Sequence, residues 1–208
     1  MSAATTATEL APPSVIDVSE LKTYAFGSRS PLFWGTACLC LIEGTALALL
    51  FTSYFYIRGN FDVWPPSARL PPVVGSVATA VLVASLLPMW LTARAAETLD
   101  LRRTRRWQLI ATIVGAAGLA LRAYEIRALP FAWSDNAYAS VVWGSIGFHT
   151  IDFIAEMGEM VVLTAILYRG PVEKKHFEDV QINAFFWWFL VVVWLPFAGV
   201  FYADGVIQ

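Results

Sequence analysis

Five long apolar stretches alternate with short polar connections along the chain. The stretches cover residues 32–57, 73–92, 107–129, 137–168 and 183–202. An α-helix needs about 20 residues to cross the hydrocarbon core of a bilayer, and each stretch reaches that length. The pattern predicts an all-α fold, a polytopic membrane protein built as a bundle of five transmembrane helices.

The first residues follow a different pattern. Residues 1–31 are rich in Ala, Thr, Ser and Pro, and they lack the basic start and continuous apolar core of a secretory signal. We therefore expect a disordered cytoplasmic N-terminal tail, followed by a single transmembrane domain over residues 32–208.

Basic residues are unevenly divided between the two sides of the predicted bundle, and cytoplasmic segments of membrane proteins carry the excess of Lys and Arg. With the N-terminus inside, the cytoplasmic basic residues are Lys22, Arg29, Arg94, Arg102, Arg103, Arg105, Arg106, Arg169, Lys174 and Lys175. The outer segments then hold Arg58, Arg69 and Arg127. The count predicts a cytoplasmic N-terminus and an external C-terminus.

The fourth stretch is apolar but carries four ionisable residues: His149, Asp152, Glu156 and Glu159. On a helix their spacings of three, four and three place them within an arc of roughly 80°. An ionisable group at membrane depth costs about a few kcal/mol unless it faces a bundle interior, a partner or water. We expect this polar stripe to face inward, where His149 and Asp152 could meet Glu43 of the first stretch near the bilayer midplane.

Three interpretations of the stripe remain open. It can hold helices together through hydrogen bonds, because polar contacts inside membranes commonly do so. It can form a proton pathway from the cytoplasmic side, along which Glu156 and Glu159 would lie. A metal site is the least favoured, because the chain has two histidines and His176 falls in a predicted loop. We predict no metal site, no bound cofactor and no catalytic residue in this chain.

The other polar and aromatic features have simpler interpretations. Glu43 is expected to be a protonated, hydrogen-bonded carboxyl group. Arg122 and Glu125, three residues apart near the outer end of the third stretch, are expected to form an ion pair. The aromatic run at residues 185–189 is expected at the interfacial, cytoplasmic start of the last helix. Pro88 and Pro196 are positions where their helices could kink.

Composition narrows the class of protein. Of the 208 residues, 58% are hydrophobic and 14% are charged, which excludes an ordinary soluble domain. A net charge of −2 gives no electrostatic footprint for nucleic acid. Cys38 and Cys40 would lie on nearly opposite faces of a helix, so we expect no disulfide between them.

Short motifs along the chain resemble those of subunit III of the haem–copper terminal oxidases, in the short five-helix bacterial form. The similar segments are residues 41–44 (LIEG), 53–58 (SYFYIR), 64–66 (WPP), 121–125 (LRAYE), 136–140 (NAYAS), 147–149 (GFH), 185–189 (FFWWF) and 193–195 (VWL). Each is weak alone, but they occur in the family's order over about residues 30–203. Glu43 falls on the family's characteristic buried glutamate.

Departures from the family pattern point to a divergent branch. Asp152 replaces the second histidine of the "GFHGLH" signature, and Glu156 replaces a glycine. In the last stretch, Trp188 and Val191 stand where His and Asp are usual. Compared with the family pattern, the last helix therefore lacks two polar groups, and the fourth helix has additional acidic groups.

The resemblance implies a subunit without redox centres, in the inner membrane of a bacterium. It would pack beside subunit I, the large subunit that holds haem and copper, together with subunit II. It would support assembly, sustained turnover and proton uptake in aerobic respiration, and it would contact phospholipid. Three alternatives stay open: an accessory subunit of a nitric-oxide reductase, a stand-alone proton-coupled transporter, and a metal-dependent membrane enzyme.

Overall fold

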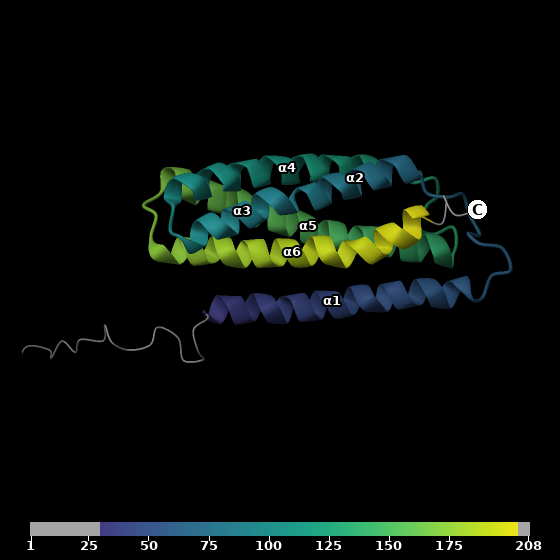
Figure 1. Ribbon diagram of the computed structural model, residues 1–208. Coiled ribbons are helices and arrows are strands. Elements are labelled where there is room, and N and C mark those ends of the chain that lie inside the picture. The colour runs from purple at the N-terminus through teal and green to yellow at the C-terminus, as the bar shows by residue number, and fades with distance from the viewer. Residues whose placement is uncertain (1–29, 204–208) are drawn as a thin grey trace, which may run out of the picture.

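The computed structural model of the protein describes residues 30–203, and within that range it contains helices and short connections and no strand. Figure 1 shows the helices running side by side along one common axis. Their bounds are α1 Pro31–Arg58, α2 Pro72–Ala84, α3 Leu86–Glu97, α4 Leu101–Arg127, α5 Ala137–Arg169 and α6 Lys174–Ala203. The predicted tail lies outside the described residues except for Ser30, which caps α1, and Pro31, which begins it.

Helices α2 and α3 form one continuous span that is broken at Ser85. Pro88 has no N–H, so the carbonyl of Ala84 cannot receive the hydrogen bond that would continue the helix through this point. The chain re-forms a regular helix at once, since the N–H of Met89 donates to the carbonyl of Ser85 at 3.2 Å. The predicted distortion near Pro88 is therefore a break one turn before the proline.

With α2 and α3 counted as one span, the described chain has five membrane-length stretches, as the sequence predicts. Four of them, α1, α2 with α3, α4 and α6, are long and apolar enough to cross a membrane. The fifth, α5, is the longest helix at 33 residues. Its polar stripe lowers its hydropathy, yet it runs alongside the others through the bundle (Figure 1).

Two helices begin earlier than the sequence predicts. Helix α4 begins at Leu101 rather than residue 107, because Asp100 caps it by accepting a hydrogen bond from the N–H of Arg103 at 3.0 Å. Helix α6 begins at Lys174 rather than residue 183. The prediction of a loop at His176 is therefore wrong, and residues 102–106 lie in the first turns of α4 rather than in a connection between helices. Hydropathy marks where a helix enters an apolar environment, whereas the helix itself continues into polar residues.

Because α6 begins early, its aromatic run lies further into the helix than the sequence predicts. Residues 185–189 lie more than ten residues into the helix, so they are not at its start as predicted. The side chain of Trp187 is fully buried, and its indole N–H donates to the hydroxyl of Ser85 at 2.9 Å. A buried indole needs such a partner, and here it fixes α6 against the α2–α3 break.

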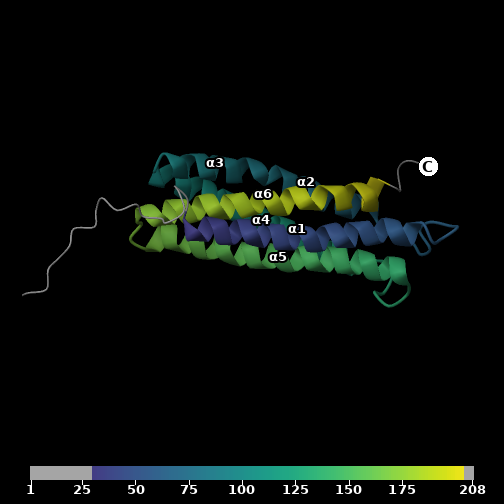
Figure 2. The same ribbon diagram turned by 90° about the horizontal axis from the view of Figure 1, so that it is seen from below.

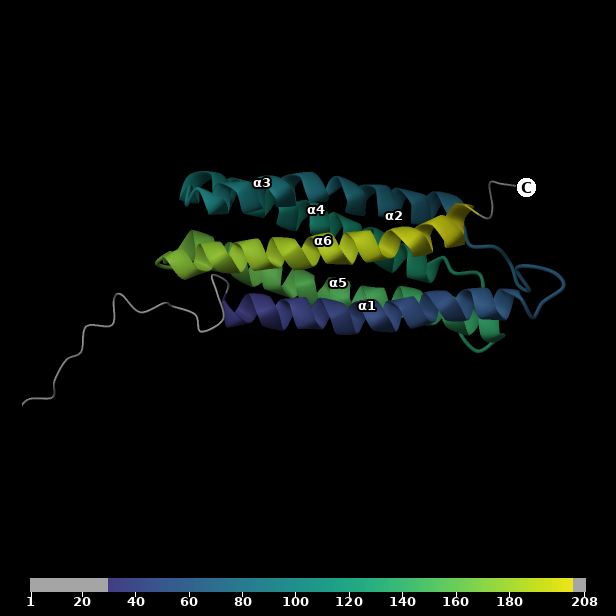
Figure 3. The same cartoon turned by 60° about the horizontal axis from the view of Figure 1, so that its bottom comes forward.

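Helix α6 lies at the centre of the bundle and α1 at its edge. Helix α6 packs against α1, α2, α3 and α5, and α4 packs against α2, α3 and α5. Helix α1 contacts only α5 and α6 among the described helices, and it stands apart from the remainder in Figure 1. The views in Figure 2 and Figure 3 show α1 lying along α5 and α6 for most of its length.

Close packing in the interior depends on glycine at two positions. A Cβ atom at Gly115 of α4 would lie 2.6 Å from the sulfur of Met157 and 2.9 Å from the ring of Trp187. At Gly75 of α2 it would overlap the ring of Tyr202. Small residues let helices approach closely inside membranes, so these two glycines set the spacing of α4 and α2 against α5 and α6.

Candidate functional site

The polar stripe of α5 divides along its length into two edges. His149 and Glu156 are seven residues apart and lie on one edge, where both are buried, at 0% and 3% exposed. Asp152 and Glu159 are also seven residues apart and lie on the other edge, where Asp152 is half-buried and Glu159 is exposed. An arc of roughly 80° is wide enough to face two different neighbours. The inner edge faces α6, and the outer edge faces α1 and the surface.

His149 joins α5 to α6 and not to α1. Its Nε2 lies 3.0 Å from the backbone carbonyl oxygen of Leu190. Since a carbonyl can only accept, Nε2 carries the hydrogen of this contact. The imidazole ring also packs on Trp194, with ring centroids 4.7 Å apart. The expectation that His149 joins Glu43 near the midplane is therefore wrong, because α6 occupies the space on that side of α5.

Glu156 makes a second contact between α5 and α6, through Asn183 of α6. The side-chain amide of Asn183 donates to Glu156 Oε1 at 2.6 Å, and Asn183 is 1% exposed. Glu156 also lines a cavity of 140 Å³ between α1, α5 and α6, along with Thr36, Leu39, Ala155, Glu159, Ile182 and Phe186. Glu156 and Glu159, predicted to lie together, do share this cavity, and Asp179 of α6 lies near Glu159.

Glu43 of α1 and Asp152 of α5 are close enough to interact electrostatically. Glu43 Oε2 is a buried atom without a hydrogen-bond partner among the described residues. Cys40, one turn before Glu43, is half-buried and a free thiol, and Cys38 is exposed. The pair of carboxyl groups predicted at this depth is therefore present, but without His149.

Arg122 and Glu125 form an ion pair deep between helices rather than at the membrane surface. Nη1 of Arg122 lies 3.0 Å from Oε2 of Glu125, and the two side chains are 2% and 4% exposed. The guanidinium carbon lies 3.8 Å from the ring centroid of Trp194, an arrangement typical of a cation–π contact. The hydroxyl of Tyr202 donates to the other oxygen of Glu125. Two side chains of α6, Trp194 and Tyr202, thus contact the buried charge pair of α4.

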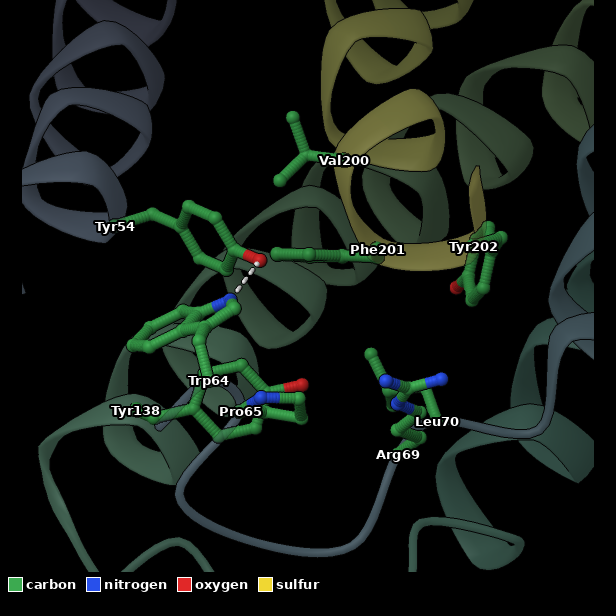
Figure 4. Close-up of a pocket in the computed structure, with 9 residues that line it drawn as sticks. All are labelled: Tyr54, Trp64, Pro65, Arg69, Leu70, Tyr138, Val200, Phe201 and Tyr202. Atoms are coloured by element: carbon green, nitrogen blue, oxygen red, sulfur yellow. Dashed lines mark hydrogen bonds between the residues drawn. The ribbon is translucent and has the colours of Figure 1, made fainter. Parts of the chain in front are cut away.

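Tyr202 connects this ion pair with a small pocket at the end of the bundle where α1 ends and α5 begins. The pocket has a volume of about 20 Å³, room for one water molecule. Figure 4 shows Tyr54, Trp64, Arg69 and Tyr202 around it, and the indole N–H of Trp64 donates to the hydroxyl of Tyr54 at 3.1 Å. Its walls join the chain after α1 to the last turn of α6, so it belongs to the packing of this end of the bundle.

The turn between α5 and α6 lies outside the spans and is tied by local contacts. The backbone N–H of Glu173 donates to Nδ1 of His176 at 2.9 Å. The ammonium group of Lys175 lies 2.9 Å from the Glu173 carboxylate, and this hydrogen bond holds the pKa of Glu173 below its usual range. His176 therefore has a local structural contact at the start of α6.

Several partners of the predicted residues could not be found from sequence. Leu190, Asn183, Trp194 and Tyr202 all lie on α6, and each is an ordinary residue for a membrane helix. The sequence does contain one signal, because a charged pair in an apolar helix requires further polar or aromatic partners. Which residues become these partners depends on the register between neighbouring helices, and the periodicity of one helix does not specify that register.

Comparison with known proteins identifies the family. Residues 32–206 match cytochrome c oxidase subunit III. The chain is 32% identical over 185 residues to the probable cytochrome c oxidase subunit 3 of Nocardia farcinica, covering 84% of this chain and 86% of that protein. It is 30% identical over 180 residues to the corresponding protein of Mycobacterium tuberculosis, covering 81% and 85%. It is 24% identical over 166 residues to that of Thermostichus vulcanus, covering 77% and 81%.

The fold and its interior define a polytopic membrane protein in which Arg122, Glu125, His149 and Glu156 are buried between helices. The chain belongs to the cytochrome c oxidase subunit III family, and it is a subunit of a haem–copper oxidase, an oxidoreductase complex. The resemblance read from the short motifs is confirmed. These relatives favour the oxidase over the nitric-oxide reductase, transporter and stand-alone enzyme alternatives.

Proposed function

We propose that this chain is a non-redox subunit that stabilises the oxidase and supplies protons to it. It packs beside subunit I, which holds the haem and copper, and subunit II, in a bacterial inner membrane with its N-terminus in the cytoplasm. It carries no metal, cofactor or catalytic residue of its own, and it contacts phospholipid at its surface. Membership of the subunit III family, over nearly the whole described chain, supports this proposal.

The observation that carries the stabilising role is that buried polar groups join different helices. Arg122 with Trp194, His149 with Leu190, and Glu156 with Asn183 each link α6 to another helix. Inside a membrane such contacts are a means of holding helices in one arrangement. A fixed bundle presents a fixed surface to the large subunit.

The proton-supply role is supported by the acidic groups near the cytoplasmic end. Asp179, Glu159 and Glu156 lie in succession from the start of α6 toward the bundle centre, and the last two line the 140 Å³ cavity. A cavity of this size has room for several waters, and carboxyl groups along it can pass protons. In the proposed orientation the cavity opens on the cytoplasmic half of the membrane.

Purification through a C-terminal tag in mild detergent tests the partners. We expect the chain to recover a haem-bearing large subunit, with an optical spectrum of haem and with oxygen consumption. Recovery of the chain alone, colourless and stable, would contradict the assignment of partners.

Replacing Glu156 and Glu159 together by Gln tests the proton role. The amides keep the shape and much of the hydrogen bonding but cannot carry protons, so we expect slower proton uptake at unchanged haem content. Proton uptake by reconstituted vesicles is measured with a pH dye in single-turnover flow experiments. An unchanged rate would remove these two residues from any proton pathway.

A further inference from the structure

Glu156 is a carboxyl group inside the bundle with apolar neighbours along its own helix. Its side chain is 3% exposed, and the residues about one turn away on either side, Phe153 and Met160, are also buried. On one side it borders the 140 Å³ cavity. A carboxyl group in such a place exchanges protons only through the oxygen that a carrier can reach, so the orientation of its two oxygens matters.

That orientation is set from the neighbouring helix. The side-chain amide nitrogen of Asn183 donates to Oε1 of Glu156 at 2.6 Å. An amide nitrogen is a donor and not an acceptor, so Oε1 must accept, whether Glu156 is ionised or neutral. The neutral carboxyl group then carries its hydrogen on Oε2. Asn183 therefore makes the two oxygens of Glu156 inequivalent.

Asn183 can hold this orientation because it is itself fixed in place. It is 1% exposed, and the residues before and after it in the chain are also buried. One turn further along α6, the indole N–H of the buried Trp187 donates to the hydroxyl of Ser85 at 2.9 Å. Side chains on packed helices are positioned more precisely than those on loops. The packing of α6 thus keeps the amide opposite Glu156.

The second carboxyl group at the cavity has different surroundings. Glu159 also lines the cavity, but it is exposed, and it lies within electrostatic reach of Asp179 near the start of α6. In the proposed orientation a proton arriving from the cytoplasm reaches Glu159 first and Glu156 next. Transfer depends strongly on the alignment of the groups that exchange the proton. The buried Glu156 is the carrier for which a fixed alignment has the larger effect.

We propose that Asn183 is a positioning residue of the proton route. Its amide keeps Oε1 of Glu156 as a permanent acceptor, so that Glu156 takes up and releases its proton through Oε2, on the side of the cavity. In uptake, Oε2 of the carboxylate gains the proton and becomes the hydroxyl oxygen, and in release the same O–H bond breaks. This inference rests on the proposed function, because it names the residue that orients the proposed proton carrier.

Infrared difference spectra of the assembled oxidase, recorded between acid and alkaline buffer, test the contact. The C=O stretch of protonated Glu156 is the band that disappears in Glu156→Gln. In Asn183→Leu the carbonyl loses its hydrogen-bond donor, so we expect this band at higher wavenumber. The control His149→Leu removes a different hydrogen bond between α5 and α6 and should leave the band in place.

Three results of the infrared experiment would overturn the proposal. The band could stay in place in Asn183→Leu, which would show that the amide does not bind the carbonyl oxygen. It could shift equally in His149→Leu, which would show a general effect of loosening the two helices. No band could depend on Glu156, and a group that never changes its protonation carries no proton.

Proton uptake by the reconstituted oxidase tests the consequence. Without the amide, Glu156 can turn Oε2 away from the cavity, so we expect uptake in Asn183→Leu to be slower by about tenfold at unchanged haem content. Asn183→Ala removes the amide without adding bulk, and it should be slowed alike even where the leucine variant assembles poorly. His149→Leu should match the native rate. A native rate in both Asn183 variants, or equal slowing in His149→Leu, would leave Asn183 with the joining of helices alone.

The two proposals fail differently. If the variant with both Glu156→Gln and Glu159→Gln takes up protons at the native rate, the proposed proton role fails. If that variant is slow but the Asn183 variants are not, the proton role stands and Asn183 does not position the carrier.

Discussion

Removing Glu125 should destabilise the bundle far more than removing the whole buried ion pair. In the native chain Arg122 and Glu125 are 3.0 Å apart and almost fully buried, so solvent screens their attraction little. Two unit charges at that distance attract by about 5 to 6 kcal/mol at an effective dielectric constant of 20. Much of this gain offsets the cost of taking both charges out of water.

Glu125→Ala leaves the guanidinium group buried with only the Trp194 ring as partner. Breaking a buried pair in this way costs about 3 to 5 kcal/mol of stability. The double variant Arg122→Met with Glu125→Leu removes both charges and fills similar volume, so we expect it to lie within about 1.5 kcal/mol of the native chain. Tyr202→Phe removes one hydrogen bond to the carboxylate and should cost about 1.5 to 3 kcal/mol.

Unfolding in mixed micelles with increasing dodecyl sulfate, followed by circular dichroism and tryptophan fluorescence, measures these differences. In the purified oxidase, the temperature at which this subunit dissociates is measured for each variant. It should rank the variants in the same order as their stabilities in micelles. If Glu125→Ala and the double variant lost equal stability, the cost would come from lost packing, and the electrostatic reasoning would be refuted.

Three further changes test the packing of α6. Gly115→Leu should prevent assembly, because the leucine side chain has no room beside the Met157 sulfur and the Trp187 indole. The control Gly199→Ala should assemble normally, because nothing lies within 4 Å of its added Cβ. The amount of this subunit recovered in the purified oxidase measures both. Trp187→Phe leaves the Ser85 hydroxyl without its donor and should cost about 1 to 3 kcal/mol in the micelle unfolding assay, and a loss below that range would show that the bond contributes little. His149→Leu should lower stability by a similar amount yet leave proton uptake unchanged, because His149 faces α6 and not the acidic cavity; a slower uptake would place it on the proton route.

The sequence predicts the number of membrane-length stretches because each apolar run reaches the length of about 20 residues that crosses a bilayer. It does not predict where α4 and α6 begin. Their first turns are polar and precede the apolar run, so a hydropathy pattern does not detect them. Asp100, in the position of a helix cap, was the available signal for α4.

The candidate site was predictable in its residues but only partly in its arrangement. The spacing of His149, Asp152, Glu156 and Glu159 correctly places them in one stripe. However, the stripe is wide enough to face two neighbours, and the sequence does not tell which helix lies on each side. Asn183 is the partner of Glu156, and Leu190 is the partner of His149. These contacts depend on how α6 is rotated about its axis and shifted along it relative to α5, and the sequence pattern does not specify either.

The position of α1 at the edge of the bundle has a consequence for synthesis. Helix α1 is made first, yet both helices that it contacts, α5 and α6, are made last. At about 5 to 20 residues per second, the 145 residues between the end of α1 at Arg58 and the end of α6 at Ala203 take roughly 7 to 30 s. Until α5 has been made, the newly inserted helix must stay in the membrane with Glu43 lacking its native neighbour Asp152. Helix α6, the last of the described helices, then completes the contacts of α1, and a chain truncated before α6 would leave α1 unattached on that side.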